Sequence, residues 1–451
     1  MAKKQILFEC QACGHQSAKW LGKCPNCGAW DEYIELSDKQ IEVLKEINSK
    51  PTTNTQSNAI PITEVSFEHI ERYSSGDREL DLVLGGGIVQ GSLTLIGGSP
   101  GVGKSTLLLK IAGNLAKEGK KVLYVSGEES SSQIKLRANR VDSNYPNLYL
   151  LPEIRLDTIF KELEKHAFEV LIIDSIQTIY SEKIASAPGS VSQVREITFE
   201  LMRFGKEKNI AIFIIGHITK EGSIAGPRVL EHMVDTVLYF EGDSSRELRL
   251  LRGFKNRFGT TSEVGIFEMT KAGLVSAKDI SKKFFTRGKA QAGSAITVLM
   301  EGSRPIVLEV QALVSDSGYP NPKRSATGYE LNRLTMLLAL LERKLDLPFN
   351  QYDVYINIAG GIKISETSAD LAIIAAIISS YRNRPISKDT IFIGEVSLIG
   401  DVRDIFNLDL RLKEAKSQQF EKAVVPSLPL EKIEGLKCYN IDEVSKLIEW
   451  M

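Results

Sequence analysis

The chain has 451 residues, which predicts two or three domains at about 150 residues per domain, with ample length for buried cores. Its 56 Lys and Arg and 57 Asp and Glu give a net charge of −1, which excludes a globally basic coat for nucleic acid. Apolar runs such as 371–378 are far shorter than the roughly 20 residues that cross a bilayer, and no signal-peptide core follows the start. We therefore expect a cytoplasmic protein without membrane contact.

Four of the five cysteines form two C-x2-C pairs separated by ten residues, near the start of the chain. Two thiolates from each tight turn can complete a tetrahedral shell around Zn²⁺, and a closed shell of this kind is structural rather than catalytic. The predicted ligands are Cys10, Cys13, Cys24 and Cys27. This predicts a zinc module over 1–37 and a polar linker over 38–61; four free structural thiols are the alternative. His15 is expected on the surface, and Cys438 is expected to be buried.

A phosphate-binding loop follows an apolar run at 92–96. The next residues contain the pattern G-x4-G-K-S, and a helix is predicted from Leu107 to about Lys117. Inward-facing N–H groups and the helix N-terminus favour phosphate, with Lys104 reaching the β- and γ-phosphates of ATP and Ser105 binding Mg²⁺. The predicted nucleotide-binding residues are Gly98, Ser99, Pro100, Gly101, Val102, Gly103, Lys104, Ser105 and Thr106.

Two further apolar strands lead into acidic residues. The strand 170–174 ends in Asp174, which is expected to hold Mg²⁺ through water. The strand 122–126 is expected beside the phosphate loop, and Glu128 after it is the first candidate to activate the attacking water. Glu129 is the second candidate, and the alternative is that it caps the following helix.

Three later residues are candidates for sensing or stabilising phosphate. His217 follows the strand 210–216 and is predicted to sense the γ-phosphate or DNA; a hydrogen-bonded core histidine is the alternative. Lys255 and Arg257 are two residues apart and are predicted to project from one strand face toward a polyphosphate, supplied to a neighbouring subunit's site. The alternative is a solvent-exposed charge pair on a hairpin without a role in phosphate binding.

The whole set of motifs resembles the RadA (also called Sms) family of bacterial DNA-repair proteins, over essentially the whole chain. The resemblance is carried by Cys24–Gly28, by the loop 98–106, by the pentapeptide Lys255–Gly259 and by the C-terminal third. It implies an α/β fold with the zinc module, a RecA-like ATPase core over 62–275, and a C-terminal α+β domain over 286–451 that is similar to the Lon peptidase.

The resemblance also implies an activity. The family is similar to RecA in its motor and to DnaB in its ring, which implies a homo-hexamer that hydrolyses ATP and binds single-stranded and branched DNA. It implies branch migration or unwinding during recombination, with a recombinase such as RecA as partner. Carried over by position, Lys104, Ser105 and Asp174 hold ATP and Mg²⁺, Glu128 is the catalytic acid, and Lys255 and Arg257 reach the next subunit's site.

Two stretches fall where RecA-like motors hold DNA-contacting loops. They are 181–191 and 219–228, with Lys183, Lys220 and Arg228 available for phosphates.

The C-terminal third begins after a boundary near 271–288, with strands predicted at 295–300 and 306–313 and helices at 331–343 and 370–380. Lon uses a Ser–Lys dyad. The aligned positions here are Ser368 and Asp409, with Lys413 and Lys416 available only if the register is off by a turn. A carboxylate is a poor base for this role, so we predict no peptidase activity and a helix-capping role for Ser368.

A basic loop at 321–324, with Arg333 beyond it, is a candidate DNA-tracking patch; a solvated loop is the alternative. The leading prediction is a DNA-dependent ATPase motor. The alternatives are a nucleotide-switched scaffold that acts on a protein partner and an ATP-dependent Lon-like protease.

Overall fold

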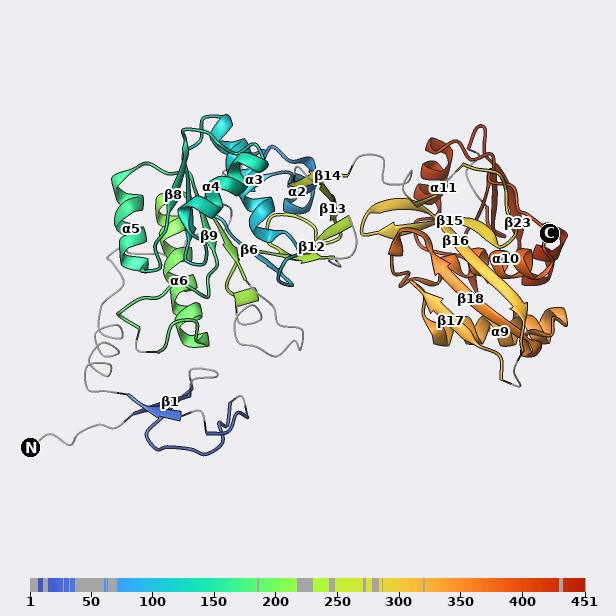
Figure 1. The fold of residues 1–451 in the computed structure, drawn as a ribbon, viewed down its shortest axis with the longest axis horizontal. Helices are drawn as coiled ribbons and strands as arrows, with labels where there is room; N and C mark the ends of the chain where they lie inside the picture. Colours follow the sequence, from blue (N-terminus) through green and yellow to red (C-terminus); the bar gives the residue numbers. More distant parts are fainter. Residues whose placement is uncertain are drawn as a thin grey trace, which may run out of the picture. The chain divides into compact units, whose positions relative to one another are not determined.

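A computed structural model of the chain divides into two compact units, residues 1–276 and 277–451 (Figure 1). It describes residues 7–10, 15–26, 28–31, 33–36, 61, 63, 71–184, 186–216, 230–242, 248–270, 273–277, 284–285, 287–318, 321–429 and 433–450. The predicted linker 38–61 lies outside these residues except for its last position. In the described part of the chain, no helix is long and apolar enough to cross a membrane.

The N-terminal module is a small antiparallel sheet in the order β2–β1–β3. Its strands are β1 (Phe8–Cys10), β2 (Gln16–Ser17) and β3 (Tyr33–Glu35). Among the residues that the structure describes here, the core cluster consists of Cys10, Cys24 and Tyr33, with Phe8 and Leu21 packed against it. The apolar burial in this described part of the module is too small to stabilise a fold by itself. This agrees with a structural metal ion that stabilises it.

A nine-stranded sheet organises the ATPase core in the order β14-β13-β12-β11-β6-β10-β9-β7-β8. The strands are β6 (Leu93–Gly98), β7 (Val122–Ser126), β8 (Leu148–Leu151), β9 (Val170–Asp174), β10 (Ala211–Ile215), β11 (Thr236–Glu241), β12 (Leu248–Asn256), β13 (Val264–Thr270) and β14 (Gly273–Ser276). The run from β11 to β8 is parallel, and β12 to β14 continue it antiparallel. A short hairpin pairs β4 (Arg72–Tyr73) with β5 (Ile88–Val89).

Helices cover both faces of this sheet (Figure 1). They are α2 (Arg78–Leu84), α3 (Lys104–Lys117), α4 (Ser131–Arg140), α5 (Leu156–Lys165) and α6 (Val191–Lys208). One core packs α2, α3 and α4 against the sheet, and a second packs α5 and α6 against the other face. This double cover explains why β6, β7, β9 and β10 are buried at every position and read as continuous apolar runs.

The predicted strands at 122–126 and 170–174 are confirmed. The expectation that the strand 122–126 lies beside the phosphate loop is wrong. β7 does not lie beside β6, because β10 and β9 stand between them. Helix α3 also begins three residues earlier than predicted, at Lys104, because Gly103 takes a left-handed conformation (φ +114°) that starts the helix inside the loop.

The C-terminal unit is built on a seven-stranded mixed sheet in the order β17-β18-β16-β15-β19-β22-β23. The strands are β15 (Ser294–Glu301), β16 (Arg304–Asp316), β17 (Arg324–Thr327), β18 (Tyr352–Ile358), β19 (Thr390–Phe392), β22 (Lys422–Pro426) and β23 (Lys437–Ile441), with a separate hairpin of β20 (Glu395–Val396) and β21 (Val402–Arg403). The helices are α9 (Leu331–Leu345), α10 (Asp370–Tyr381) and α11 (Leu408–Ser417), with short turns η2 (Phe349–Gln351), η3 (Ala359–Gly361), η4 (Thr367–Ala369) and η5 (Val444–Trp450).

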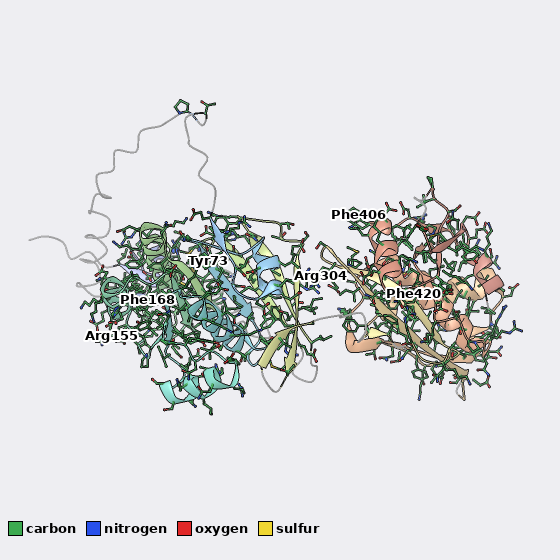
Figure 2. All side chains as sticks on the ribbon, turned by 90° about the horizontal axis from the view of Figure 1, so that it is seen from above. Tyr73, Arg155, Phe168, Arg304, Phe406 and Phe420 are labelled. Carbon is green, nitrogen blue, oxygen red and sulfur yellow. The ribbon has the colours of Figure 1, made fainter. Side chains whose placement is uncertain are left out.

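The two helices predicted here are confirmed within two residues of their ends. Helix α10 is buried over its first ten positions, which is why its sequence is almost wholly apolar. Phe420 is fully buried in this unit, whereas Phe406 before α11 is 83% exposed (Figure 2). Cys438 on β23 is only partly buried, so the expectation of a buried cysteine is wrong.

Candidate nucleotide-binding site

The phosphate loop joins β6 to α3 at the carboxyl edge of the sheet. Gly98 has φ +149°, and a Cβ there would lie 2.4 Å from the carbonyl oxygen of Phe240, so only glycine fits. Around Gly101 (φ +75°) no described atom outside residues 100–102 lies within 4 Å of the place a Cβ would take. The backbone of this turn is therefore open to the close approach of a ligand, as a phosphate cradle requires.

Lys104 is the charged centre of this loop, with only 3% of its surface exposed. Its Nζ donates to the carbonyl oxygens of Gly98 at 2.7 Å and Ser99 at 3.0 Å. Burial lowers the pKa of Lys104 to about 8, and the negative charges of Asp174 and Glu128 oppose that shift. A buried ammonium that binds only carbonyl oxygens is well placed to exchange them for phosphate oxygens.

The lowered pKa predicts that ATP binding takes up a proton at alkaline pH. Without nucleotide Lys104 loses its proton near pH 8, whereas phosphate oxygens favour the charged form. We expect ATP to bind about tenfold more weakly at pH 9 than at pH 7, with close to one proton taken up at pH 9. Calorimetry in two buffers of different ionisation enthalpy measures both quantities, and binding at pH 9 without proton uptake would contradict the assignment.

Asp174 ends β9 and is almost fully buried. Its Oδ2 accepts a hydrogen bond of 2.5 Å from the Tyr124 hydroxyl, and the Ser105 side chain bonds to the same carboxyl group. Burial raises the pKa of Asp174, and these two hydrogen bonds oppose the rise. Ser105 and Asp174 thus bring two hard oxygen donors together, a set that fits Mg²⁺.

Glu128 and Glu129 follow β7, and the structure separates their surroundings. Glu128 accepts a 2.5 Å hydrogen bond from Ser175, the residue after Asp174. Glu129 is paired with Arg137 on α4. The cap of α4 is Ser130, so a capping role for Glu129 is wrong. Because Arg137 already neutralises Glu129, the geometry favours Glu128 as the water-activating carboxylate.

Gly127 joins β7 to Glu128 at a crowded position. A Cβ on Gly127 would lie 2.5 Å from both Ile154 and Thr178, so no other residue fits between them. A glycine therefore lets the chain pass close to these two side chains just before Glu128, whose negative charge acts to raise the pKa of Lys104.

Lys255 lies on β12 at the opposite, amino edge of the sheet. Its Nζ donates to the carbonyl oxygens of Glu231 at 2.8 Å, His232 at 3.1 Å and Val234 at 2.8 Å. These residues come just before β11, whose first residue pairs with Thr94 near the start of β6. The Lys255 ammonium is therefore held by the backbone just before β11, at the amino edge of the sheet. The phosphate loop follows β6 at the carboxyl edge and does not hold it.

Arg257 follows β12 at the same edge and is 53% exposed on its side chain. It lies 3.6 Å from Asp235, whose other oxygen accepts from the backbone N–H of Leu93, the first residue of β6. The charge of Arg257 helps to lower the pKa of Lys255, after the larger effect of burial, so the two cations lie close together. The length of β6, about 20 Å at 3.3 Å per residue, separates them from their own phosphate loop.

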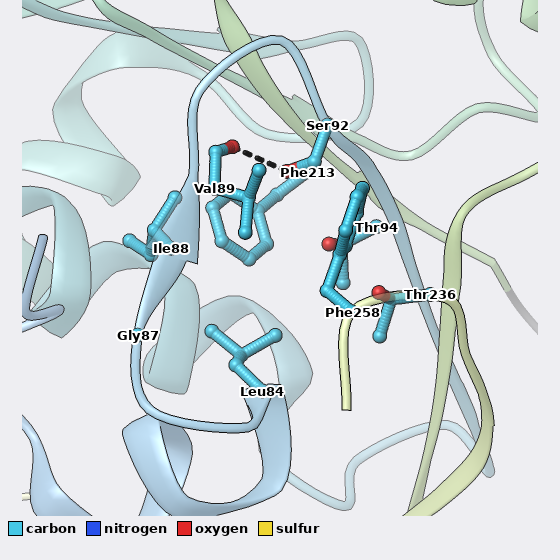
Figure 3. A pocket seen from close by; sticks show the side chains of 9 residues that line it. All are labelled: Leu84, Gly87, Ile88, Val89, Ser92, Thr94, Phe213, Thr236 and Phe258. Atoms are coloured by element: carbon cyan, nitrogen blue, oxygen red, sulfur yellow. Dashed lines mark hydrogen bonds between the residues drawn. The ribbon is translucent and has the colours of Figure 1, made fainter. Parts of the chain in front are cut away.

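The rest of the pentapeptide is anchored at this amino edge. Phe258 lines a small pocket with residues from the α2–β5 segment, β6, β10 and β11 (Figure 3). The Arg72 guanidinium donates to the carbonyl oxygen of Phe258. No phosphate-loop residue lines this pocket, so it fixes the position of the pentapeptide and is not the nucleotide site.

One of the two predicted DNA loops can be followed in part. Gln193 on α6 donates through Nε2 to the carbonyl oxygens of Ser181 at 3.1 Å, Ile184 at 3.0 Å and Ser186 at 2.9 Å, which fixes the first half of the loop 181–191. Lys183 is exposed and pairs with Asp157 at 2.7 Å. His217, Lys220, Arg228 and the stretch 219–228 lie outside the described residues.

Cys10 and Cys24 are both buried in the core of the zinc module. The Tyr33 hydroxyl donates to Cys24 Sγ at 3.5 Å, a contact suited to a thiolate, and lies 2.6 Å from His15 Nδ1. His15 is therefore part of the support around the cysteines and not a free surface residue. Cys13 and Cys27 lie outside the described residues. The two described cysteines fit a zinc site.

The peptidase-like site of the C-terminal unit holds Arg411, and the predicted register is wrong by two residues. Arg411 on α11 is buried and donates through Nη1 to Ser368 Oγ at 3.0 Å, while Asp409 is exposed on the same helix. Arg411 also pairs with Glu366 at 2.7 Å. Ser368 is buried in η4 and does not cap α10. A guanidinium stays protonated and cannot act as the dyad base.

We therefore predict a structural role for Ser368 and no peptidase activity. Wild-type protein and Ser368→Ala should both leave casein intact, because Arg411 cannot accept the serine proton. The same variant should lower the free energy of unfolding of this unit by about 1 kcal/mol, since a buried hydrogen bond to Arg411 is lost. Casein digestion by the wild type that stops in Ser368→Ala would refute this, and thermal unfolding measures the stability change.

Arg333 does not belong to the proposed basic patch. It forms an ion pair with the fully buried Asp370 and donates to the carbonyl oxygen of Val396 at 2.8 Å. Lys323 is exposed, and Arg324 lies 3.9 Å from Glu342. The patch is thus reduced to the loop 321–324.

Sequence patterns did not single out three supporting residues of the nucleotide site. Tyr124 and Ser175 read as core strand and turn residues, yet they hold Asp174 and Glu128. Arg249 on β12 is buried and donates to the carbonyl oxygen of Val102 in the phosphate loop at 3.2 Å. The sequence of β12 also contains Arg252 and Lys255, so the charge of Arg249 did not mark it, and only its burial in the fold does.

Comparison with known proteins places this site in a family. Residues 61–223 match a family model described as an AAA domain, residues 8–32 match a rubredoxin metal binding domain, and residues 336–428 match the subunit ChlI of Mg-chelatase. The chain is 68% identical to the DNA repair protein RadA of Campylobacter jejuni over 451 residues, covering 100% of both chains. It is 59% identical to that of Helicobacter pylori strain J99 over 100% of both chains, and 46% identical to that of Bacillus subtilis over 99% of each.

The chain belongs to the RadA family of DNA-repair proteins. This RadA-family protein has the three-part α/β organisation predicted from its sequence, with a zinc-ribbon-type module, a P-loop ATPase domain and a C-terminal domain of the ChlI and Lon type. The AAA match supports ATP binding and hydrolysis, and the rubredoxin match supports zinc binding.

Proposed function

We propose that this RadA-family protein is a DNA-dependent ATPase motor whose active sites form between adjacent subunits of a homo-hexameric ring. The observation that carries the proposal is the position of its charges. Lys104 lies at the carboxyl edge of the sheet, whereas Lys255 and Arg257 lie at the amino edge of the same sheet. Cations that lie a strand length away from their own phosphate loop can serve only a nucleotide bound to another copy.

Each residue then has one task in ATP hydrolysis. The loop amides from Gly98 to Thr106 and the Lys104 ammonium hold the phosphates, and Ser105 and Asp174 hold Mg²⁺, which neutralises phosphate charge when bound. Glu128 orients the attacking water. Arg257 from the neighbouring subunit, with Lys255 beside it, stabilises the charge that develops on the γ-phosphoryl group.

The work done by the ring is proposed to be branch migration or unwinding of recombination intermediates, on single-stranded and branched DNA and together with a recombinase such as RecA. Support comes from the curated relatives, which are named DNA repair proteins. It also comes from the loop that begins seven positions after Asp174, because movement at the nucleotide can pass directly to 181–191. Contacts to the DNA backbone would make the motor largely independent of sequence.

A second DNA contact is proposed at the loop 321–324. Lys323→Ala with Arg324→Ala should weaken single-stranded DNA binding and reduce the salt slope of log K by about 1 to 2, because each phosphate contact releases counterions. Binding titrations at several salt concentrations measure the slope. Lys413→Ala with Lys416→Ala removes the same charge from α11 and serves as the control. Equal slopes in both double variants would remove the loop from the DNA path.

ATP hydrolysis with and without single-stranded DNA, at two salt concentrations, tests the proposed function. Stimulation by DNA that fades as salt rises would support a DNA motor. A rate of hydrolysis that is the same with and without DNA would instead indicate a nucleotide-switched scaffold acting on a protein partner.

A further inference from the structure

The hydroxyl of Tyr124 lies in an apolar core yet bonds to the proposed Mg²⁺-holding carboxylate. Tyr124 is 1% exposed and packs among the buried side chains between the sheet and α3. β7 and β9 run parallel with Tyr124 opposite Ile172 and Ser126 opposite Asp174. Side chains two residues apart on a strand share a face, so Tyr124 and Asp174 point to the same side of the sheet. The Tyr124 hydroxyl reaches one step along that face to Asp174 Oδ2, at 2.5 Å.

A phenylalanine would fill this space equally well and would bury no polar atom. A hydroxyl in such surroundings is unfavourable unless it is hydrogen-bonded, and a charged acceptor makes the strongest partner. Tyr73 packs against the same core, and its hydroxyl has no hydrogen-bond partner in the part of the chain that the structure describes. The two tyrosines therefore differ in one respect that matters here, the contact with Asp174.

We propose that Tyr124 is a positioning residue that fixes the Asp174 carboxylate for Mg²⁺, an inference that rests on the proposed ATPase function. Tyr124 holds Oδ2 from the core side. The carboxylate's remaining lone pairs are left to Ser105 and to the water shell of a metal ion. Removing the hydroxyl frees the carboxylate to rotate, so Mg²⁺ binds less tightly while the phosphate loop itself is unchanged.

The test compares Tyr124→Phe with Tyr73→Phe, each of which removes one buried hydroxyl. Binding of a fluorescent, non-hydrolysable ATP analogue is titrated with Mg²⁺, and bound Mn²⁺ is counted by electron paramagnetic resonance. For Tyr124→Phe we expect an about tenfold higher Mg²⁺ concentration at half-maximal effect and an unchanged affinity in EDTA. Tyr73→Phe should match the wild type in both.

An unchanged Mg²⁺ requirement in a folded Tyr124→Phe would overturn the inference, and so would an equal loss of affinity in EDTA. Adding Tyr124→Phe to Asp174→Asn should have no further effect on the Mg²⁺ requirement, because the hydroxyl acts only through that carboxylate. Wild-type protein that binds the analogue equally in Mg²⁺ and in EDTA would count against the proposed function itself, which separates the two failures.

Discussion

Lys104→Ala is expected to reduce ATP hydrolysis by at least about 10²- to 10³-fold, because it removes the buried ammonium that faces the phosphates. The neighbouring carboxylates add to the effect. Asp174 and Glu128 both act on Lys104, so its loss leaves two negative charges beside the triphosphate without a resident cation. Steady-state phosphate release, with and without DNA, measures the loss.

The matched control for this variant is Lys117→Ala. Lys117 lies at the other end of α3 and is exposed, so the same truncation there should leave hydrolysis within about twofold of the wild type. Substantial hydrolysis by Lys104→Ala, in a preparation free of other ATPases, would remove the phosphate loop from the catalytic centre.

Arg257→Ala should lower the rate of hydrolysis by about 10³-fold or more while ATP affinity stays within a few fold, as for other cations supplied across an interface. A mixing experiment tests that the site is shared. Lys104→Ala subunits carry an intact Arg257, and Arg257→Ala subunits carry an intact Lys104. Mixed rings therefore contain some complete sites, and activity should reappear from two inactive proteins. Mixtures that stay inactive, although the subunits exchange, would place Arg257 outside the neighbour's site.

Lys255→Ala should stall the motor while nucleotide binding stays largely intact. In the structure Lys255 holds three carbonyl oxygens just before β11, so it must release this backbone before it can meet a phosphate. Loss of nucleotide affinity in Lys255→Ala, measured with the same fluorescent analogue, would contradict a role across the interface.

Much of the nucleotide site was predictable because its chemistry is local in the sequence. The phosphate loop needs glycines, a lysine and a serine at fixed spacing, and Asp174 and Glu128 each follow an apolar strand. The order of those strands was not predictable in the same way. The insertion of β9 and β10 between β6 and β7 depends on pairing between distant segments, which residue spacing does not encode.

The supporting residues were missed for a related reason. Tyr124 reads as one more buried strand residue, and only the register of β7 against β9 brings its hydroxyl to Asp174. Arg411 was missed because a register error of two residues on α11 exchanges a buried position for an exposed one. The conclusion about peptidase chemistry survives the error, since neither an aspartate nor an arginine can serve as the lysine base.

The opposite placement of the phosphate loop and the Arg257 edge has a consequence for how activity depends on protein concentration. A contact between two different edges is head-to-tail, and such contacts either close into a ring or continue as an open chain. If the sites are shared as proposed, the last phosphate loop in an open row of subunits has no neighbour, and a single subunit has no complete site. Catalysis per subunit should therefore rise steeply with protein concentration and level off only when the ring is closed.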